Sequence, residues 1–274
     1  MLNPKIEQIE FELLLEGIYQ AYGYDFRDYA PASLRRRVQK SMDNLGVKTI
    51  SEFQDKILHE KESFVHFLNT VSIDVTAMFR DPDFFLAVRQ KIVPIIRELP
   101  SVRIWHAGCA TGEEVYAMAI LLQEENLYNK VRIYATDMNA VVLDKAKNGI
   151  YPLKNIQDCT ANYHKSGGSH EFSTYYTAKY NNVIMKPELK KNIVWAQHNL
   201  VTDRSFHEFD LILCRNVMIY FERPLQEHVH QLFLDSMPIG GILGLGKKET
   251  MYSSAFRPNY MEMDGNAKLF RRVK

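Results

Sequence analysis

The sequence lacks the features that mark membrane-spanning, secreted and metal-binding proteins. No apolar run approaches the roughly 20 residues that a transmembrane helix needs, and the glutamate-rich N-terminus carries no cleavable signal pattern. The three cysteines (Cys109, Cys159 and Cys214) and the nine histidines show no metal-ligand spacing. We therefore expect a protein of the reducing cytoplasm, with no metal and no direct insertion into a membrane.

An excess of charge of one sign is also absent. Lysine and arginine total 34 against 33 acidic residues, which argues against a dedicated nucleic-acid-binding protein. No repeat or low-complexity segment interrupts the chain, whose 274 residues can hold one large or two modest domains. We expect a protein that binds no nucleic acid; its oligomeric state stays open, with a monomer as one alternative.

Residues 1–95 predict a separate helical domain. In the first helix, apolar side chains recur at helical spacing, with one offset at Phe11: Ile6, Ile9, Phe11, Leu13, Leu14 and Ile18. A second helix is predicted over Leu34–Met42, ending near Gly46, and Ser51 is a candidate N-cap of a third. The basic cluster Arg35–Arg37 has two interpretations, a solvated helix face or a docking surface for an acidic helical partner.

A glycine-containing turn is predicted between a strand and a helix. Val102–Ile104 is typical of a buried strand and Val115–Leu122 of a helix, and Gly108 and Gly112 lie between them. Glycine lets backbone approach a ligand, and the helix start offers unpaired N–H groups. The turn is therefore a candidate nucleotide-type site, although two glycines by themselves also fit a tight turn that binds nothing.

The residues of this turn favour one kind of ligand. The GxGxxG spacing of dinucleotide enzymes is missing, and Glu113 and Glu114 at the helix start disfavour a pyrophosphate. A carboxylate there suits a ligand that carries positive charge. S-adenosylmethionine, with its ammonium and sulfonium groups, fits better than NAD or ATP.

The next predicted strand, Val131–Thr136, ends in Asp137. In nucleotide-binding α/β sheets an acidic residue at this place holds a ribose diol by two hydrogen bonds. The alternative is that Asp137 is the N-cap of the helix that follows. We favour ribose binding, because the glycine turn and the acidic residue occur together in the expected order.

The remaining residues predict a parallel sheet with an insert. Strands are predicted at 193–197, 209–214 and 240–245, followed by a C-terminal hairpin over 260–273. Residues 153–190 interrupt the alternation of strands and helices, and Asn181-Asn182 within them predicts a hairpin turn. Arg215, Asn216 and Tyr220 follow the 209–214 strand, at the end where open α/β sheets bind ligands.

The chain resembles the chemotaxis-receptor methyltransferase (CheR) family in four runs that occur in the family's order: Thr76–Asp81, Ala107–Glu114, Ala135–Asp137 and Cys214–Phe221. The Ala-Thr-Gly-Glu-Glu and Cys-Arg-Asn-Val-x-Ile-Tyr-Phe runs are specific to that family. The resemblance implies an α/β fold, with a class I (Rossmann-like) methyltransferase sheet over 96–274, an all-α domain over 1–95 and a small β-subdomain inserted at 153–190.

The resemblance also implies an activity and a site. The activity is transfer of a methyl group from S-adenosylmethionine to glutamate carboxylates of a chemoreceptor or related signalling protein, leaving S-adenosylhomocysteine. The implied cofactor-binding residues are Thr76, Arg80, Ala107, Gly108, Glu114, Asp137, Asn199, Leu200, Arg215 and Asn216. Arg80 and Tyr220 are the implied catalytic residues near the reacting methyl group. From its apolar surroundings in the sequence, Arg80 is expected to pair with Asp81, Asp83 or a ligand carboxylate.

The chain departs from the family pattern in three places. Asp74 stands where asparagine is common, and Gly246-Lys247-Lys248-Glu249 replaces a Gly-His-Ser-Glu turn at the expected substrate entrance, unless its lysines are simply solvated. The insert is longer and more aromatic than in the chemotaxis enzymes, so peptide binding by the insert is not carried over. Two other functions therefore stay open: a methyltransferase of this fold with a protein substrate outside chemotaxis, and a signalling module that binds S-adenosylmethionine without turnover.

Overall fold

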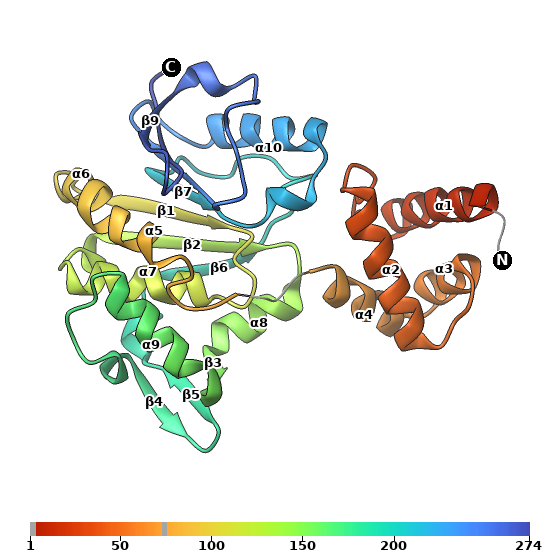
Figure 1. Cartoon of the computed structure of the whole chain (residues 1–274), viewed down its shortest axis with the longest axis horizontal. Coiled ribbons are helices and arrows are strands. Elements are labelled where there is room, and N and C mark those ends of the chain that lie inside the picture. Colours follow the sequence, from red (N-terminus) through yellow and green to blue (C-terminus); the bar gives the residue numbers. More distant parts are fainter. Residues whose placement is uncertain (1–3, 73–75) are drawn as a thin grey trace. The chain divides into compact units, whose positions relative to one another are not determined.

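The structure is a computed structural model that describes residues 4–72 and 76–274 (Figure 1). Its chain divides into two compact units. Unit 1 contains the N-terminal helices up to residue 73 with residues 201–203 and 220–229, and unit 2 contains 74–200, 204–219 and 230–274. Asp74 lies outside the described residues. No helix in the described ranges combines the length and the apolar character needed to cross a bilayer.

Unit 1 is a bundle of helices: α1 (Pro4–Tyr22), α2 (Pro31–Leu45), α3 (Ile50–His59) and α4 (Lys61–Val71). The predicted end of the second helix is confirmed, because Gly46 caps α2 with a φ of 68°, a left-handed conformation that glycine adopts without strain. The candidate cap Ser51 is wrong. Thr49 caps α3 instead, through a reciprocal capping box with Glu52.

The predicted apolar stripe of α1 is only partly buried. Leu14 and Ile18 are buried together with Phe11, but Ile6, Ile9 and Leu13 remain 51%, 48% and 55% exposed. Helix α1 is apolar on more than one face. Its packing partner α3 covers only part of that surface, which periodicity alone cannot reveal.

The basic cluster of α2 does not form one surface. The Arg37 guanidinium is buried, donates to the Val71 carbonyl and lies 4.4 Å from the centre of the Tyr220 ring. Arg35 is half-buried over the Phe11 ring. Arg36 is exposed, so a basic docking surface on α2 is smaller than the run of arginines suggests.

Unit 2 is built on a sheet with the strand order β6-β2-β1-β7-β8-β10-β9 among the described residues. Its strands are β1 (Val102–Ala107), β2 (Val131–Asp137), β6 (Ile193–Gln197), β7 (Leu211–Cys214), β8 (Ile242–Leu245), β9 (Tyr260–Asp264) and β10 (Leu269–Arg272). The first five of these strands are parallel to one another, and β10 runs antiparallel to both β8 and β9. The predicted C-terminal hairpin that closes the sheet is therefore confirmed.

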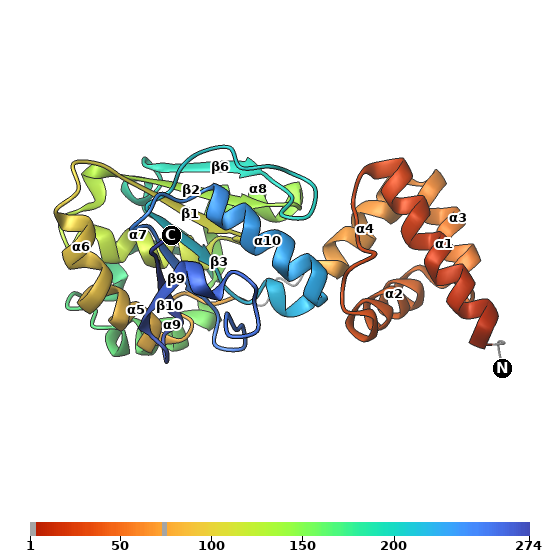
Figure 2. The same cartoon turned by 90° about the horizontal axis from the view of Figure 1, so that it is seen from above.

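Alternating side chains of the strands bury two faces of this sheet. Ile104, Ile133 and Leu211 point to the core that also contains helix α7 (Glu113–Glu124), whose residues 115–122 are all buried. Trp105, on the other face of β1, packs its ring against Phe209 and Phe233. Phe233 lies on helix α10 (Arg223–Asp235), so α7 and α10 cover opposite faces of the sheet, which lies between them in Figure 1 and behind α10 in Figure 2.

The helical segment before β1 belongs to the sheet unit. Helix α5 (Pro82–Ala87), a π-helical turn (Val88–Ile92) and α6 (Val93–Arg97) form one continuous helical run, and Phe85 and Ile92 lie in the core of unit 2. Pro94 removes a backbone donor from this run, which fits the π-helical turn just before it. The division between the units therefore falls near residue 73, whereas the helical pattern of the sequence placed it near 95.

The insert contains a small antiparallel sheet of order β3-β5-β4, from β3 (Ile150–Pro152), β4 (Tyr176–Lys179) and β5 (Asn182–Met185). The predicted hairpin is confirmed, because β4 and β5 pair directly across Tyr180 and Asn181. The insert also contains helix α9 (Ile156–Lys165), which the sequence did not predict. The remaining helices are α8 (Ala140–Asn148) and short 3₁₀ turns at 128–130, 153–155, 172–175, 187–189, 218–220 and 257–259.

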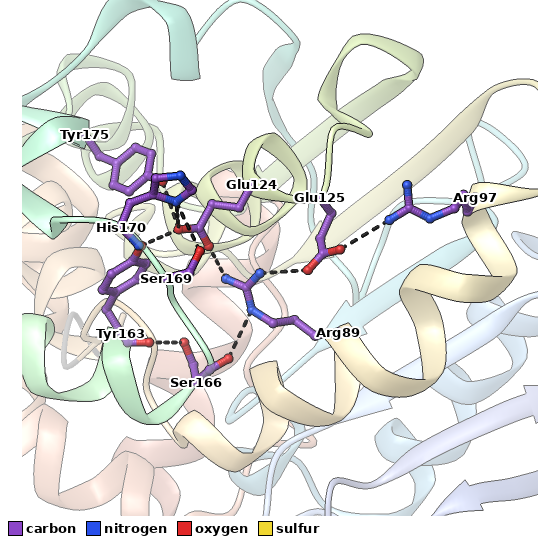
Figure 3. A network of polar contacts seen from close by, with 9 residues as sticks. All are labelled: Arg89, Arg97, Glu124, Glu125, Tyr163, Ser166, Ser169, His170 and Tyr175. Atoms are coloured by element: carbon purple, nitrogen blue, oxygen red, sulfur yellow. Dashed lines mark hydrogen bonds and ion pairs between the residues drawn. The ribbon is translucent and has the colours of Figure 1, made fainter.

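A buried glutamate ties the insert to α7 (Figure 3). The Glu124 side chain is 3% exposed and accepts hydrogen bonds from Arg89 Nη2 and from the Tyr163 and Tyr175 hydroxyls. Burial raises the pKa of Glu124, but the Tyr163, Arg89 and Tyr175 hydrogen bonds outweigh it and the pKa is lowered. Glu124 therefore remains ionised and satisfied at the far end of α7 from Glu114.

Replacing Glu124 by glutamine should destabilise the protein by about 2–3 kcal/mol, because charged hydrogen bonds are lost and Arg89 keeps a buried charge. Urea denaturation measures this change. The exposed Glu188→Gln is the matched control and should stay within about 0.5 kcal/mol of the parent protein. Equal stability of the two variants would contradict the role assigned to Glu124.

Candidate functional site

The site candidates gather at the carboxyl ends of the parallel strands. The chain passes from β1 through β2 to β6 on one side and then returns to β7 and β8 on the other side of β1. The strand order therefore reverses between β1 and β7. Open α/β sheets bind ligands at such a reversal, outside the carboxyl ends of the strands.

Each predicted cofactor residue can be placed on unit 2. Ala107 ends β1 and Gly108 follows it, Asp137 ends β2, and Glu114 is the second residue of α7. Asn199 and Leu200 follow β6, Arg215 and Asn216 follow β7, and Thr76 and Arg80 precede α5. Apart from Thr76 and Arg80, these positions all lie at strand ends or at the start of α7, on one edge of the sheet.

The glycines of the turn after β1 are needed for its own backbone. Gly108 has a φ of 78°, and a Cβ on it would lie 2.6 Å from Val217 Cγ2. Gly112 has a φ of 87° and is the N-cap of α7, where a Cβ would lie 2.8 Å from Ala146 Cβ. The close approach that excludes a side chain is therefore between protein segments.

Asp137 connects the ends of β1 and β2. Its Oδ2 accepts the Ala110 N–H at 2.9 Å, and its Oδ1 accepts the Asn139 N–H at 3.0 Å. The N-cap of α8 is Asn139, whose side chain accepts the Val141 N–H, so the alternative role of Asp137 as that cap is wrong. Asp137 instead holds the turn of β1 against the end of β2.

Arg215 lies at the centre of an ion-pair network. Its Nη1 donates to Glu114 Oε2 at 2.6 Å and its Nη2 to Asp81 Oδ2 at 2.9 Å, while its side chain is 1% exposed. The guanidinium carbon also lies 3.9 Å from the centre of the Phe84 ring. These contacts join the end of β7, the start of α7 and the segment before α5.

Glu114 is held as a carboxylate within this network. His106 Nδ1 lies 3.1 Å from Glu114 Oε1, on the oxygen opposite Arg215. Burial alone would raise the pKa of Glu114, but the Arg215 charge and the hydrogen bond from His106 outweigh it and lower the pKa to about 2. Glu114 therefore stays ionised at neutral and mildly acidic pH.

Arg80 lies in a strained turn. Phe79 and Asp81, its two neighbours, both have a φ of 54°, which is uncommon for residues with a side chain. Arg80 itself is half-buried. Asp81 and Asp83, the two local partners considered for Arg80, lie 3.6 and 3.7 Å from Lys247 Nζ.

A cavity of about 370 Å³ opens beside this network. Its lining is given by Asp83, Phe84, Arg215, Leu245, Lys247, Asn266 and Ala267. Lys247 thus faces a cavity next to Arg215 and is not only a solvated loop residue. One of the two lysines of the altered Gly246–Glu249 turn therefore lies beside the candidate site.

Sequence reasoning missed the role of Glu249. This glutamate is 5% exposed, and its carboxylate accepts four backbone N–H groups, from Asn216, Val217, Met218 and Gly246. Burial raises the pKa of Glu249, although these four bonds act in the opposite direction. A lone glutamate after two lysines carries no sequence signal of such a position.

Tyr220 belongs to unit 1, where the Arg37 guanidinium faces its ring and its carbonyl accepts the Ala30 N–H at 2.9 Å. Its relation to Arg80, the other implied catalytic residue, therefore stays a prediction.

The residues of the edge fit a ligand with both positive charge and hydroxyl groups. Asp137, Glu113 and Glu114 are carboxylates at or near strand and helix ends, and Arg80 is the cation suited to a ligand carboxylate. A pyrophosphate would meet Glu113 and Glu114 at the start of α7, where it needs free N–H groups. S-adenosylmethionine fits this donor set, with its ammonium, sulfonium, carboxylate and ribose groups.

The sequence matches two family descriptions that together span nearly all of it. Residues 74–265 match "CheR methyltransferase, SAM binding domain" and residues 9–72 match "CheR methyltransferase, all-alpha domain". The chain is 44% identical over 272 residues to the putative methyltransferase Cher3 of Pseudomonas putida, covering 99% of this chain and 100% of that protein. It is 30% identical over 273 residues to a chemotaxis protein methyltransferase of Borreliella burgdorferi, covering 91% of each.

The network predicts a pH dependence of stability. Because the folded pKa of Glu114, about 2, lies below its ordinary value of 4.5, its contribution is complete above about pH 4.5 and is lost as the pH falls toward 2. The stability advantage of the parent protein over Glu114→Gln should therefore shrink by about 1 kcal/mol between pH 6 and pH 3.5. Urea denaturation of both proteins at the two pH values measures it, and a constant difference would refute the prediction.

Proposed function

Because the chain belongs to the CheR methyltransferase family and is thus an S-adenosylmethionine-dependent protein methyltransferase, we propose that it methylates glutamate carboxylates of a chemoreceptor or related signalling protein in the cytoplasm. The observation that carries the proposal is the meeting of Asp137, Glu114 and Arg215 where the strand order reverses. This is the edge of an open α/β sheet where ligands bind.

Within this proposal the cofactor is held by the residues of that edge. Asp137 lies where a ribose diol is bound, and Thr76, Ala107, Gly108, Asn199, Leu200 and Asn216 complete the set of proposed cofactor contacts. Arg215 and Glu114 neutralise each other and hold the loops that carry the other groups. When bound, the cofactor supplies a methyl carbon on a sulfonium, so that a new C–O bond forms while the C–S bond breaks and the electron pair stays on sulfur.

The chain's own residues then have to orient an anion and exclude water. A glutamate carboxylate has a pKa of about 4.3 and is ionised at neutral pH, so no general base is needed. Arg80 orients the carboxylate, and Tyr220 is the second proposed catalytic residue. Alignment of this kind contributes about 7–11 kcal/mol to lowering a barrier.

Arg80→Ala should lower methyl transfer by about 10²-fold or more, because the incoming carboxylate is no longer aligned. Cofactor affinity, measured by calorimetry, should stay within a few fold. Arg80→Lys is the matched variant: it keeps the charge and loses the planar fork, so an intermediate rate is expected. Full turnover by Arg80→Ala would remove this residue from the proposed mechanism.

The proposed protein partner is an acidic helical segment that meets α2. Arg36 and Lys40 are the exposed cations of that helix. Arg36→Glu should raise the KM for the protein substrate several-fold and leave cofactor affinity unchanged, whereas Lys48→Glu, an exposed change before α3, should alter neither. Equal effects of the two variants would argue against docking on α2.

A substrate outside chemotaxis is the second candidate. Lys247, beside the cavity next to Arg215, stands in a turn that differs from the family's Gly-His-Ser-Glu pattern at the expected substrate entrance. Incubation with radiolabelled S-adenosylmethionine and cell extract, followed by alkaline release of methanol, distinguishes the functions. Base-labile label on a receptor supports the proposal, base-labile label on another protein supports the second candidate, and the absence of any label contradicts both.

A further inference from the structure

The turn that follows β7 is held by a carboxylate from another loop. Glu249 Oε1 accepts the N–H groups of Val217 and Met218, each at 2.9 Å. Its Oε2 accepts the N–H of Asn216 at 3.1 Å and the N–H of Gly246 at 2.5 Å. Three successive N–H groups after Arg215 thus form an anion-binding concavity, which Glu249 fills from within the chain.

Gly246 packs closely against this carboxylate and against the turn after β7. A Cβ on Gly246 would lie 2.8 Å from both the Asn216 nitrogen and Glu249 Oε2. Asn216 has a φ of 63°, a left-handed conformation that a residue with a side chain rarely adopts without support from its surroundings. The support here is the pair of bonds from Glu249 to Asn216 and to the residue after it.

We propose that Glu249 is a positioning residue for cofactor binding, which fixes the turn after β7 and so sets where Arg215 and Asn216 lie. The inference rests on the proposed cofactor site, since it acts through two residues of that site. Glu249 itself accepts backbone N–H groups with both oxygens and is 5% exposed, so it acts through the turn and does not touch the ligand.

Glu249→Gln is the most direct test, because it keeps the size of the side chain. One oxygen remains an acceptor for two N–H groups, while the new NH₂ group meets the other two donors and repels them. We expect the Kd for S-adenosylhomocysteine, measured by calorimetric titration of the full chain, to rise at least tenfold. The kcat at saturating S-adenosylmethionine should stay within threefold of the parent value. The substitution should therefore raise the KM for the cofactor and leave the rate of the saturated enzyme nearly unchanged.

The matched control is Glu124→Gln, which alters a glutamate that is also buried in unit 2 but lies at the far end of α7. It should lower stability in urea and leave the Kd within twofold. If both variants weaken binding equally, the effect of Glu249 is general destabilisation and the inference is overturned. It is also overturned if folded Glu249→Gln binds as tightly as the parent protein.

A second variant tests the positioning role of Glu249 if Glu249→Gln does not fold. Gly246→Ala keeps the carboxylate and pushes its Cβ against Asn216 and Glu249, so it should raise the Kd threefold or more. An unchanged Kd for folded Gly246→Ala overturns the inference.

Asp137→Asn separates failure of the inference from failure of the proposed cofactor site. If Asp137→Asn weakens binding and Glu249→Gln does not, only the positioning role is wrong. If neither variant changes the Kd, the cofactor site itself is misplaced and the positioning role falls with it.

Discussion

The buried guanidinium of Arg215 is the constraint on which the candidate site depends. A buried cation is costly unless it is fully paired, and Arg215 finds its two carboxylates, Glu114 and Asp81, on segments far from it in the sequence. The start of α7 and the turn before α5 are therefore held against the end of β7. Because the pair is internal, neither Glu114 nor Arg215 offers a free charge to a ligand, and their contribution to binding is to fix the loops around it.

Part of the strained backbone of unit 2 lies in the same loops, while Asn126, Tyr180 and Lys268 have a positive φ elsewhere in the unit. Phe79, Asp81, Ala110 and Asn216 all have a positive φ, and each belongs to a segment that the network or its neighbouring turns hold. Such conformations cost about 1–3 kcal/mol each and persist only where the surroundings over-determine them. Here the surroundings are charged hydrogen bonds: Asp137 to Ala110, Arg215 to Asp81 and Glu249 to Asn216. The hydrogen bonds of these carboxylates thus offset the backbone strain at the edge of the sheet.

The sequence predicted the parts of the fold that follow from local pattern. The apolar runs of β1, β7 and β8 and the hairpin turn at Asn181 need no knowledge of the rest of the chain. The prediction from the sequence was wrong where the position of a residue depends on which other segment packs against it. The exposure of Ile6, Ile9 and Leu13 depends on which face of α1 meets α3, and the assignment of residues 82–97 to the sheet unit depends on the side chains that bury Phe85 and Ile92. Helix α9 was not predicted, because its segment is part of the aromatic insert, where apolar residues show no clear helical period.

The candidate site shows the same limit. The residues that end strands, Asp137 and Arg215, could be found because the edge of a parallel sheet is implied by strand order. The carboxylate that holds the turn after Arg215 could not be found, since Glu249 lies more than thirty residues after Asn216 and nothing near it in the sequence indicates that four N–H groups converge on it.

Two glutamates of unit 2 with buried side chains have different structural roles. Glu124 accepts side-chain donors from the insert and from Arg89, so it joins whole elements. Glu249 accepts only backbone donors, from two neighbouring turns, so it defines the path of the chain. Loss of the acceptor that binds side-chain donors loosens the packing of elements, whereas loss of the acceptor that binds backbone N–H groups changes the path of a loop. For this reason equal burial of the two carboxylates does not imply equal consequences for the edge of the sheet where the cofactor is proposed to bind.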